Sequence, residues 1–163
     1  MAVREVCEAN EEIKKSIIIE FVGEVHPSFK EFVTSDATLA SITKFTSTVP
    51  HRELMNIYST SAVLVLILIG YKDAEGYMPG KLFEYLATGI PILGVGPTEG
   101  DASTLIEETQ SGSMMDENDL EGIKNTIKNC FEEWRNNKPV INARYSKKYS
   151  RKIITEYLVN YLQ

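Results

Sequence analysis

A helix followed by a strand is predicted by the segment Tyr77-Met78-Pro79-Gly80-Lys81-Leu82-Phe83-Glu84-Tyr85-Leu86-Ala87-Thr88-Gly89-Ile90-Pro91-Ile92-Leu93-Gly94. Proline fits the first turn of a helix, because the N–H that it lacks would have no intrahelical partner there. Glycine often follows the last helical residue. We therefore expect a helix that begins at Pro79 and ends near Gly89, and an apolar strand over residues 90–95.

An anion-binding site is predicted at the start of this helix. The backbone N–H groups of Gly80, Lys81 and Leu82 have no intrahelical acceptor, and the helix macrodipole adds partial positive charge at this end. Gly80 has no side chain to obstruct an approaching ligand. Phosphate or carboxylate oxygens are favoured at such a position.

Glu84 is the one acid in this otherwise apolar helix. It lies one turn after Gly80 on the same face, and one ionised carboxylate can accept hydrogen bonds from both adjacent hydroxyls of a ribose. The alternative is that Glu84 points to solvent and pairs with Lys81. The residues alone leave both interpretations open.

The motif Lys-Leu-Phe-Glu-Tyr-Leu-Ala-x-Gly-x-Pro-Ile, at residues 81–92, resembles a signature of retaining glycosyltransferases with the GT-B fold. It is similar to the carboxyl-terminal, donor-binding half of glycosyltransferase family 4 in particular. Other segments follow in the order that this family shows, namely residues 21–23, 49–54, 58–66 and 97–101, and Gly112. The resemblance covers about residues 17–134. It implies an α/β fold with a doubly wound, Rossmann-like parallel sheet.

The resemblance also implies roles for individual residues. Glu84 matches the acid that binds the ribose, and the backbone at 80–82 faces the distal phosphate and the sugar. Residues 98–101 match a loop that lines the sugar, although Asp101 is equally well explained as a helix N-cap. Val49 matches a position whose backbone touches the base. The predicted donor-binding residues are Gly23, Val49, Gly80, Lys81, Leu82, Glu84, Thr98, Gly100 and Asp101.

Two further candidates are Glu75 and His26. The family often has two glutamates eight positions apart, but Gly76 stands eight positions before Glu84, and Glu75 is one position out of register. A solvated loop charge is the simpler interpretation of Glu75. His26 follows the predicted strand at 17–22, where it would stand beside the nucleotide or be merely exposed. No catalytic residue is predicted.

Strands and helices alternate along the chain, which is typical of βαβ units and a parallel sheet. The apolar run 62–69 predicts a strand buried on both faces, and the spacing of Leu120, Ile123, Ile127 and Phe131 predicts one buried helix face. The predicted helices cover residues 3–15, 27–34, 51–58, 101–108 and 118–134, with two more helical pieces after Pro139. The other predicted strands cover residues 17–22, 42–45 and 113–115.

Composition indicates one globular domain over residues 1–163, because 43% of the residues are hydrophobic and 25% are charged. The net charge of −6 argues against a nucleic-acid partner. Cys7 and Cys130 are interpreted as reduced core residues, which favours a cytoplasmic location. His26 and His51 stand in no cluster with metal-ligand spacing, so neither a metal nor a cofactor is predicted.

Basic residues gather late in the chain at Arg144, Lys147, Lys148, Arg151 and Lys152. A solvated helix face is the ordinary interpretation of such a run. A surface for anionic lipid or a protein partner is the alternative, which would place the protein at the inner face of a membrane.

The resemblance implies that the chain is the donor-binding part of a cytoplasmic enzyme that transfers a sugar from a nucleotide diphosphate to a glycan, lipid-linked or cell-envelope acceptor. We expect a fragment, inactive alone, which lacks the amino-terminal acceptor domain and the first strand with its phosphate turn. A natural short protein is the competing interpretation. The functional alternatives are a GT-B sugar-nucleotide epimerase and a non-catalytic nucleotide-binding module.

Overall fold

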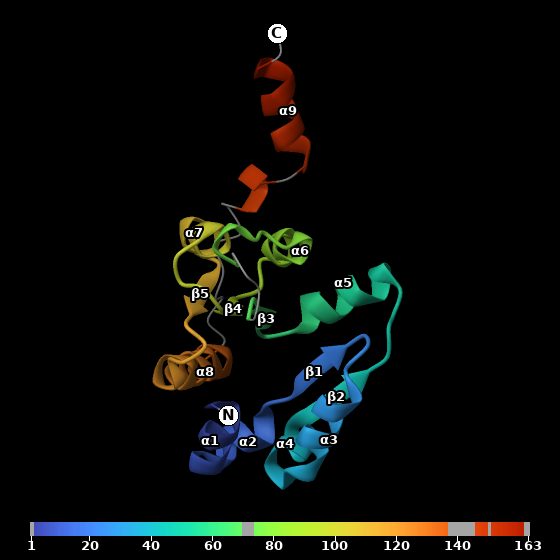
Figure 1. Cartoon of the computed structure of the whole chain (residues 1–163), viewed down its shortest axis with the longest axis vertical. Helices are drawn as coiled ribbons and strands as arrows, with labels where there is room; N and C mark the ends of the chain where they lie inside the picture. The colour runs from blue at the N-terminus through green and yellow to red at the C-terminus, as the bar shows by residue number, and fades with distance from the viewer. Residues whose placement is uncertain (1, 70–73, 137–145, 150, 162–163) are drawn as a thin grey trace. The chain divides into compact units, whose positions relative to one another are not determined.

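The computed structural model describes residues 2–69, 74–136, 146–149 and 151–161 (Figure 1). The chain divides into two compact units. Unit 1 consists of Met1–Ile57 and Leu120–Glu132, and unit 2 consists of Tyr58–Asp119 and Glu133–Gln163. One boundary falls within helix α5 (His51–Thr60), one just before helix α8 (Leu120–Arg135) and one within α8.

Unit 1 contains a two-stranded parallel sheet, in which Ile19 of β1 lies opposite Thr43 of β2. Parallel strands need a crossover connection, and two helices, α3 and α4, provide it. The elements of unit 1 are α1 (Ala2–Ala9), α2 (Glu11–Ser16), β1 (Ile19–Val22), α3 (Pro27–Ser35), α4 (Ala37–Ile42), β2 (Thr43–Thr46), most of α5 (His51–Thr60) and most of α8 (Leu120–Arg135).

Two helix boundaries in unit 1 differ from the prediction. The predicted single helix over 3–15 is wrong, because Asn10 interrupts it and caps α2 by accepting hydrogen bonds from the backbone N–H groups of Glu12 (3.0 Å) and Ile13 (3.1 Å). Helix α4 was not predicted. Its signal was Asp36, whose carboxylate caps it by accepting from the N–H of Leu39 at 2.9 Å.

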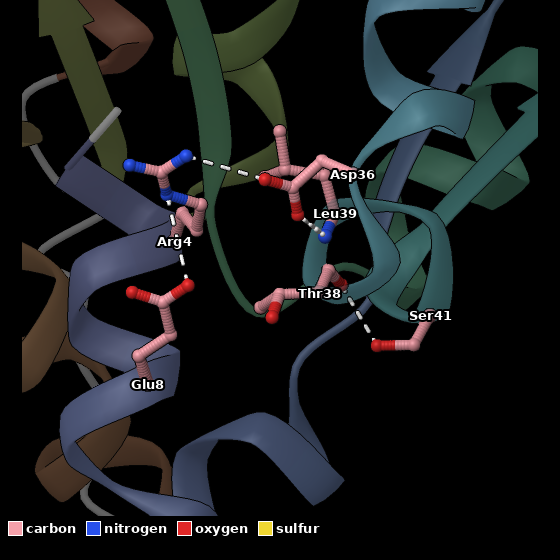
Figure 2. A network of polar contacts seen from close by, with 6 residues as sticks. All are labelled: Arg4, Glu8, Asp36, Thr38, Leu39 and Ser41. Atoms are coloured by element: carbon pink, nitrogen blue, oxygen red, sulfur yellow. Dashed lines mark hydrogen bonds and ion pairs between the residues drawn. The ribbon is translucent and has the colours of Figure 1, made fainter.

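Asp36 also joins two helices of unit 1 through charge (Figure 2). The guanidinium of Arg4 on α1 donates to the Asp36 carboxylate at 3.2 Å, and Arg4 lies 3.7 Å from the Glu8 carboxylate. The bond from Leu39 N–H is the main cause that lowers the pKa of Asp36, and the bond from Arg4 adds to it. The ionised form of Asp36 therefore stabilises the start of α4.

Unit 2 contains a three-stranded parallel sheet in the order β3-β4-β5. Its apolar core includes Leu66 and Leu82, both 0% exposed, together with Leu105 and Ile106 of α7. The elements are β3 (Leu64–Ile67), η1 (Ala74–Gly76), α6 (Gly80–Thr88), β4 (Ile92–Val95), α7 (Asp101–Glu108), β5 (Gly112–Met115), η2 (Ser146–Tyr149) and α9 (Arg151–Tyr161). The last two confirm the helical pieces predicted after Pro139.

The prediction that residues 62–69 are buried on both faces is wrong. Leu64, Leu66 and Leu68 are buried, but Val65 and Ile67, which point to the opposite face, are 45% and 48% exposed. The reason is that α6 and α7 both pack on the face of this sheet that carries Leu64, Leu66 and Leu68, which leaves the opposite side chains of β3 outside that core (Figure 1). The fold is therefore mixed α/β with two small parallel sheets, which is compatible with a Rossmann-like fold but is not a clear doubly wound sheet.

The predicted apolar face of α8 is correct only in part. Phe131 is buried and Ile127 packs against the core of unit 1, but Leu120 is 43% exposed because it is the first residue of the helix. Cys7 is buried and Cys130 is half-buried. Within the described residues, no helix combines the length and the apolar character that a membrane span requires.

Candidate functional site

Helix α6 begins at Gly80, one residue later than predicted, and Pro79 is the extended residue before it (φ −71°, ψ 139°). The Leu82 N–H donates to the Pro79 carbonyl at 3.0 Å. The prediction that this N–H is available to a ligand is therefore wrong, because a tight first turn satisfies it. In the described part of the chain, no hydrogen bond occupies the backbone N–H of Gly80 or Lys81.

The start of α6 is open to solvent. Gly80 and Lys81 are both exposed, and a Cβ atom placed on Gly80 would have no atom within 4 Å. The two N–H groups of this turn therefore stand where an anion can reach them. At its other end, α6 stops at Gly89, which has the left-handed conformation (φ 70°) that glycine adopts without strain.

Glu84 is half-buried on α6, at the position predicted for the ribose-binding acid. Burial is the main cause that raises the pKa values of Tyr58 and Tyr85, and the charge of Glu84 adds to it. Gly80 and Glu84 are one turn apart, which gives them a common helix face. Helix α6 therefore carries both an N-terminal turn that is open to solvent and a half-buried acid, Glu84.

Sequence reasoning did not select the two tyrosines beside Glu84. The ring of Tyr85 meets the ring of Tyr58 edge to face, with 5.0 Å between the ring centroids and 86° between the ring planes. Tyr85 is 8% exposed, and burial, followed by the proximity of Tyr58, raises the pKa of Tyr85 to about 12. The sequence placed both tyrosines in motif segments, but it gave no sign that they touch.

The backbone of Glu75 lies next to the backbone of Gly100, in the loop before α7. Gly100 has φ 151°, and a Cβ atom on it would stand 2.5 Å from the carbonyl oxygen of Glu75. Gly100 is the N-cap residue of α7 and Asp101 is its first helical residue, so the N-cap interpretation of Asp101 is wrong. The side chains of Glu75, Thr98 and Asp101 are exposed.

Three predicted site residues belong to unit 1. Gly23 ends β1 with φ 112° and donates its N–H to the Thr46 carbonyl at 2.9 Å. The His26 ring is exposed and caps α3, since its Nδ1 atom accepts from the Ser28 N–H at 3.3 Å. Val49 is half-buried just before α5. His26 thus has a local structural role, whereas ligand contacts of Gly23 and Val49 remain predictions.

The late basic residues are described only in part. Arg144 lies outside the described residues, and of the others the structure describes the side chains of Lys148 and Lys152, which are exposed. The Lys148 ammonium is 4.0 Å from the Glu108 carboxylate, which also accepts a hydrogen bond from the Tyr149 hydroxyl. Over the described ranges, no three His, Cys, Asp or Glu side chains form a group able to hold a metal ion.

The chain matches no protein-family model, and no curated protein matches it. Function is therefore proposed from the geometry of α6 and the sequence motif that it carries.

Proposed function

We propose that the chain is the donor-binding part of a retaining GT-B glycosyltransferase, which transfers a sugar from a nucleotide diphosphate to an acceptor. The observation that supports this proposal most is the arrangement on α6. The N–H groups of Gly80 and Lys81 are exposed at the start of the helix, and Glu84 stands half-buried one turn further along.

The two features suit the two ends of a nucleotide diphosphate. Gly80 and Glu84 are four positions apart, which corresponds to about 6 Å along the helix axis. One ligand is long enough to place a phosphate on the N–H groups and its ribose hydroxyls on the carboxylate. The Lys81 side chain adds positive charge beside the phosphate.

The proposed mechanism follows from the charge that develops on the leaving group. When the bond from the sugar to the distal phosphate breaks, the diphosphate gains negative charge, which the helix N–H groups stabilise more than they stabilise the intact donor. Loss of one donor of this kind can raise the barrier by about 3 kcal/mol. The acceptor and the remaining catalytic groups belong to the acceptor domain, so the chain alone would bind a donor without turning it over.

The same proposal includes a doubly wound, Rossmann-like sheet, a single donor-binding domain and a cytoplasmic location. Both observed sheets are parallel with helical crossovers, as such a fold requires. Under this proposal residues 98–101 line the sugar beside Glu75.

Ligand-observed NMR with UDP-, GDP-, dTDP- and ADP-sugars tests the proposal. We expect at least one donor to bind, and we expect Glu84→Gln to weaken its binding by roughly 1.5 to 3 kcal/mol, or about 10- to 100-fold, through loss of a charge-assisted bond. Glu107→Gln is the matched control, since it makes the same chemical change at an exposed acid of α7. Equal binding to the wild type and Glu84→Gln, or no binding at all, would refute the proposal.

A further inference from the structure

Positive charge is concentrated near the end of the chain. Arg144, Lys147, Lys148, Arg151 and Lys152 fall within residues 144–152, a stretch that contains no Asp or Glu. The chain as a whole has a net charge of −6, so this stretch has the opposite sign to the rest of the protein. An anionic surface therefore repels most of the chain and attracts this part of it.

Tyr149 of η2 attaches this stretch to the core of unit 2. Its ring packs against that core, and its hydroxyl donates to the carboxylate of Glu108, the last residue of α7. The Lys148 ammonium lies 5.1 Å from the centroid of the Tyr149 ring and 4.0 Å from the Glu108 carboxylate. The Lys148 side chain is 62% exposed, and an ion pair between exposed groups is weak. Tyr149 therefore holds η2 in place while the charge of Lys148 remains at the surface.

Helix α9, which follows η2, has an amphipathic sequence. Its large apolar residues recur mainly at the spacing of one helix face, at Ile153, Ile154, Tyr157, Leu158 and Tyr161. The side chains that the structure describes on the opposite face are exposed, namely Lys152, Thr155, Glu156, Val159 and Asn160. A helix with basic residues at one end, one apolar face and several tyrosines is typical of segments that lie in the interface of a membrane.

We propose that η2 and α9 together, the η2-α9 arm, dock on an anionic lipid bilayer. The basic residues at positions 148, 151 and 152 meet the headgroups, and the apolar face of α9 enters the boundary between headgroups and acyl chains. An acidic protein would satisfy the charge alone, whereas a bilayer satisfies both the charge and the apolar face. This inference goes beyond the proposed function and does not depend on it.

Co-sedimentation of the full chain with lipid vesicles tests the charge. We expect binding to vesicles of phosphatidylcholine mixed with phosphatidylserine, no binding to phosphatidylcholine alone, and loss of binding at high salt. Combining Lys148→Gln, Arg151→Gln and Lys152→Gln should weaken binding by about 10- to 100-fold, because each basic residue near an anionic surface adds to the attraction.

The matched control makes the same chemical change at three exposed basic residues of unit 1, Lys15, Lys30 and Lys44. Each triple variant loses ion pairs as well as charge, since Lys148 pairs with Glu108 and Lys44 pairs with Glu20. Binding of the control should stay within a few-fold of the wild type. Equal losses in the two variants, or no binding of the wild type to anionic vesicles, would overturn the inference.

Leu158→Ser separates a bilayer from a soluble acidic partner. It should weaken binding to the anionic vesicles several-fold and leave binding to inorganic polyphosphate unchanged, because only the bilayer receives the apolar face. Val159→Ser is the control, since Val159 lies on the opposite, exposed face of α9. If Leu158→Ser and Val159→Ser bind the vesicles equally well, the apolar face does not enter the bilayer, and the proposal of a lipid surface fails.

Discussion

Three ion pairs supplement an apolar core in joining distant segments of unit 1, whereas unit 2 relies mainly on apolar side chains and closely packed backbone. In unit 1, Arg4 pairs with Asp36 (3.2 Å), Lys124 with Glu5 (2.9 Å) and Lys44 with Glu20 (2.8 Å). In unit 2, buried leucines of β3 pack against α6 and α7. The backbones of Gly100 and Glu75 touch there as well.

Both units have an apolar core, so the difference lies in the ion pairs that unit 1 adds to its core. Ion pairs near the surface contribute little and are screened by salt. Burial of a leucine contributes several times more and is insensitive to salt. We therefore expect unit 1 to respond more strongly than unit 2 to pH and ionic strength, while both units respond to changes of side-chain volume in their cores. The candidate site lies on a helix whose buried face packs in the core of unit 2, as a site that must hold its geometry requires.

Of the substitutions that test this comparison, Leu66→Ala should destabilise the protein most. Leu66 is 0% exposed at the centre of unit 2, so the substitution leaves a cavity and should destabilise the protein by about 2 to 5 kcal/mol. Hydrogen exchange measured by mass spectrometry resolves the units, and protection should fall first in β3, β4 and α6. Equal loss in both units would mean that the chain unfolds as a single cooperative structure.

Val65→Ala is the matched control on the same strand. Val65 is 45% exposed, so its truncation should cost less than about 1 kcal/mol. A cost equal to that of Leu66→Ala would show that the outer face of β3 is covered in solution.

Gly100→Ala should cause the next largest loss of stability. A Cβ atom at this position would stand 2.5 Å from the Glu75 carbonyl oxygen and 2.8 Å from its Cα atom, and alanine rarely adopts φ 151°. The backbone must move to relieve this clash, which should destabilise the folded protein by about 1 to 3 kcal/mol. We expect a lower urea midpoint and faster exchange in α7 and η1. Gly76→Ala is the control, because a Cβ atom there would meet nothing within 4 Å.

Local patterns predicted the elements well, because local contacts determine them. Helix α7 has the predicted bounds, Asp101–Glu108, and the strands fall within two residues of their predicted positions. The error at Asn10 is also local. An Asn N-cap is a recognised helix start, and it was overlooked within a run of good helix formers.

Tertiary contacts could not be predicted in the same way. The spacing of Gly80 and Glu84 follows from helix geometry, so the sequence could place them on one face. The contacts of Tyr58 with Tyr85 and of Glu75 with Gly100 join segments that are distant in the chain. The exposed face of β3 likewise depends on which face of the sheet the helices cover, and an apolar run does not contain that information.

Asp36→Asn tests the dependence of unit 1 on charge. Asparagine can still cap α4, so the substitution removes mainly the charge that pairs with Arg4. Because the pKa of Asp36 is lowered in the folded state, its ionised form stabilises the protein above the unfolded value of about 4, and this contribution is lost as the pH falls through the folded value.

We therefore expect Asp36→Asn to lower the urea midpoint at neutral pH, and we expect its difference from the wild type to shrink below about pH 4. Measurements across this range at low salt, with exchange of α4 as the local readout, check the prediction. A constant difference at every pH would show that the charge of Asp36 is not involved.

Lys44→Met should change the stability of the protein least, because Lys44 is 61% exposed. The hydrogen bond from Lys44 is the main cause that lowers the pKa of Glu20, and the bond from the Thr46 hydroxyl is the second. Removing the ammonium should raise the Glu20 pKa only part of the way to its usual value, since Thr46 still donates. ¹³C NMR titration of the Glu20 carboxyl measures this, with Lys15→Met as a control on an exposed pair. A Glu20 pKa unchanged by Lys44→Met would show that this cross-strand pair does not form in solution, and that unit 1 relies less on charge than its geometry indicates.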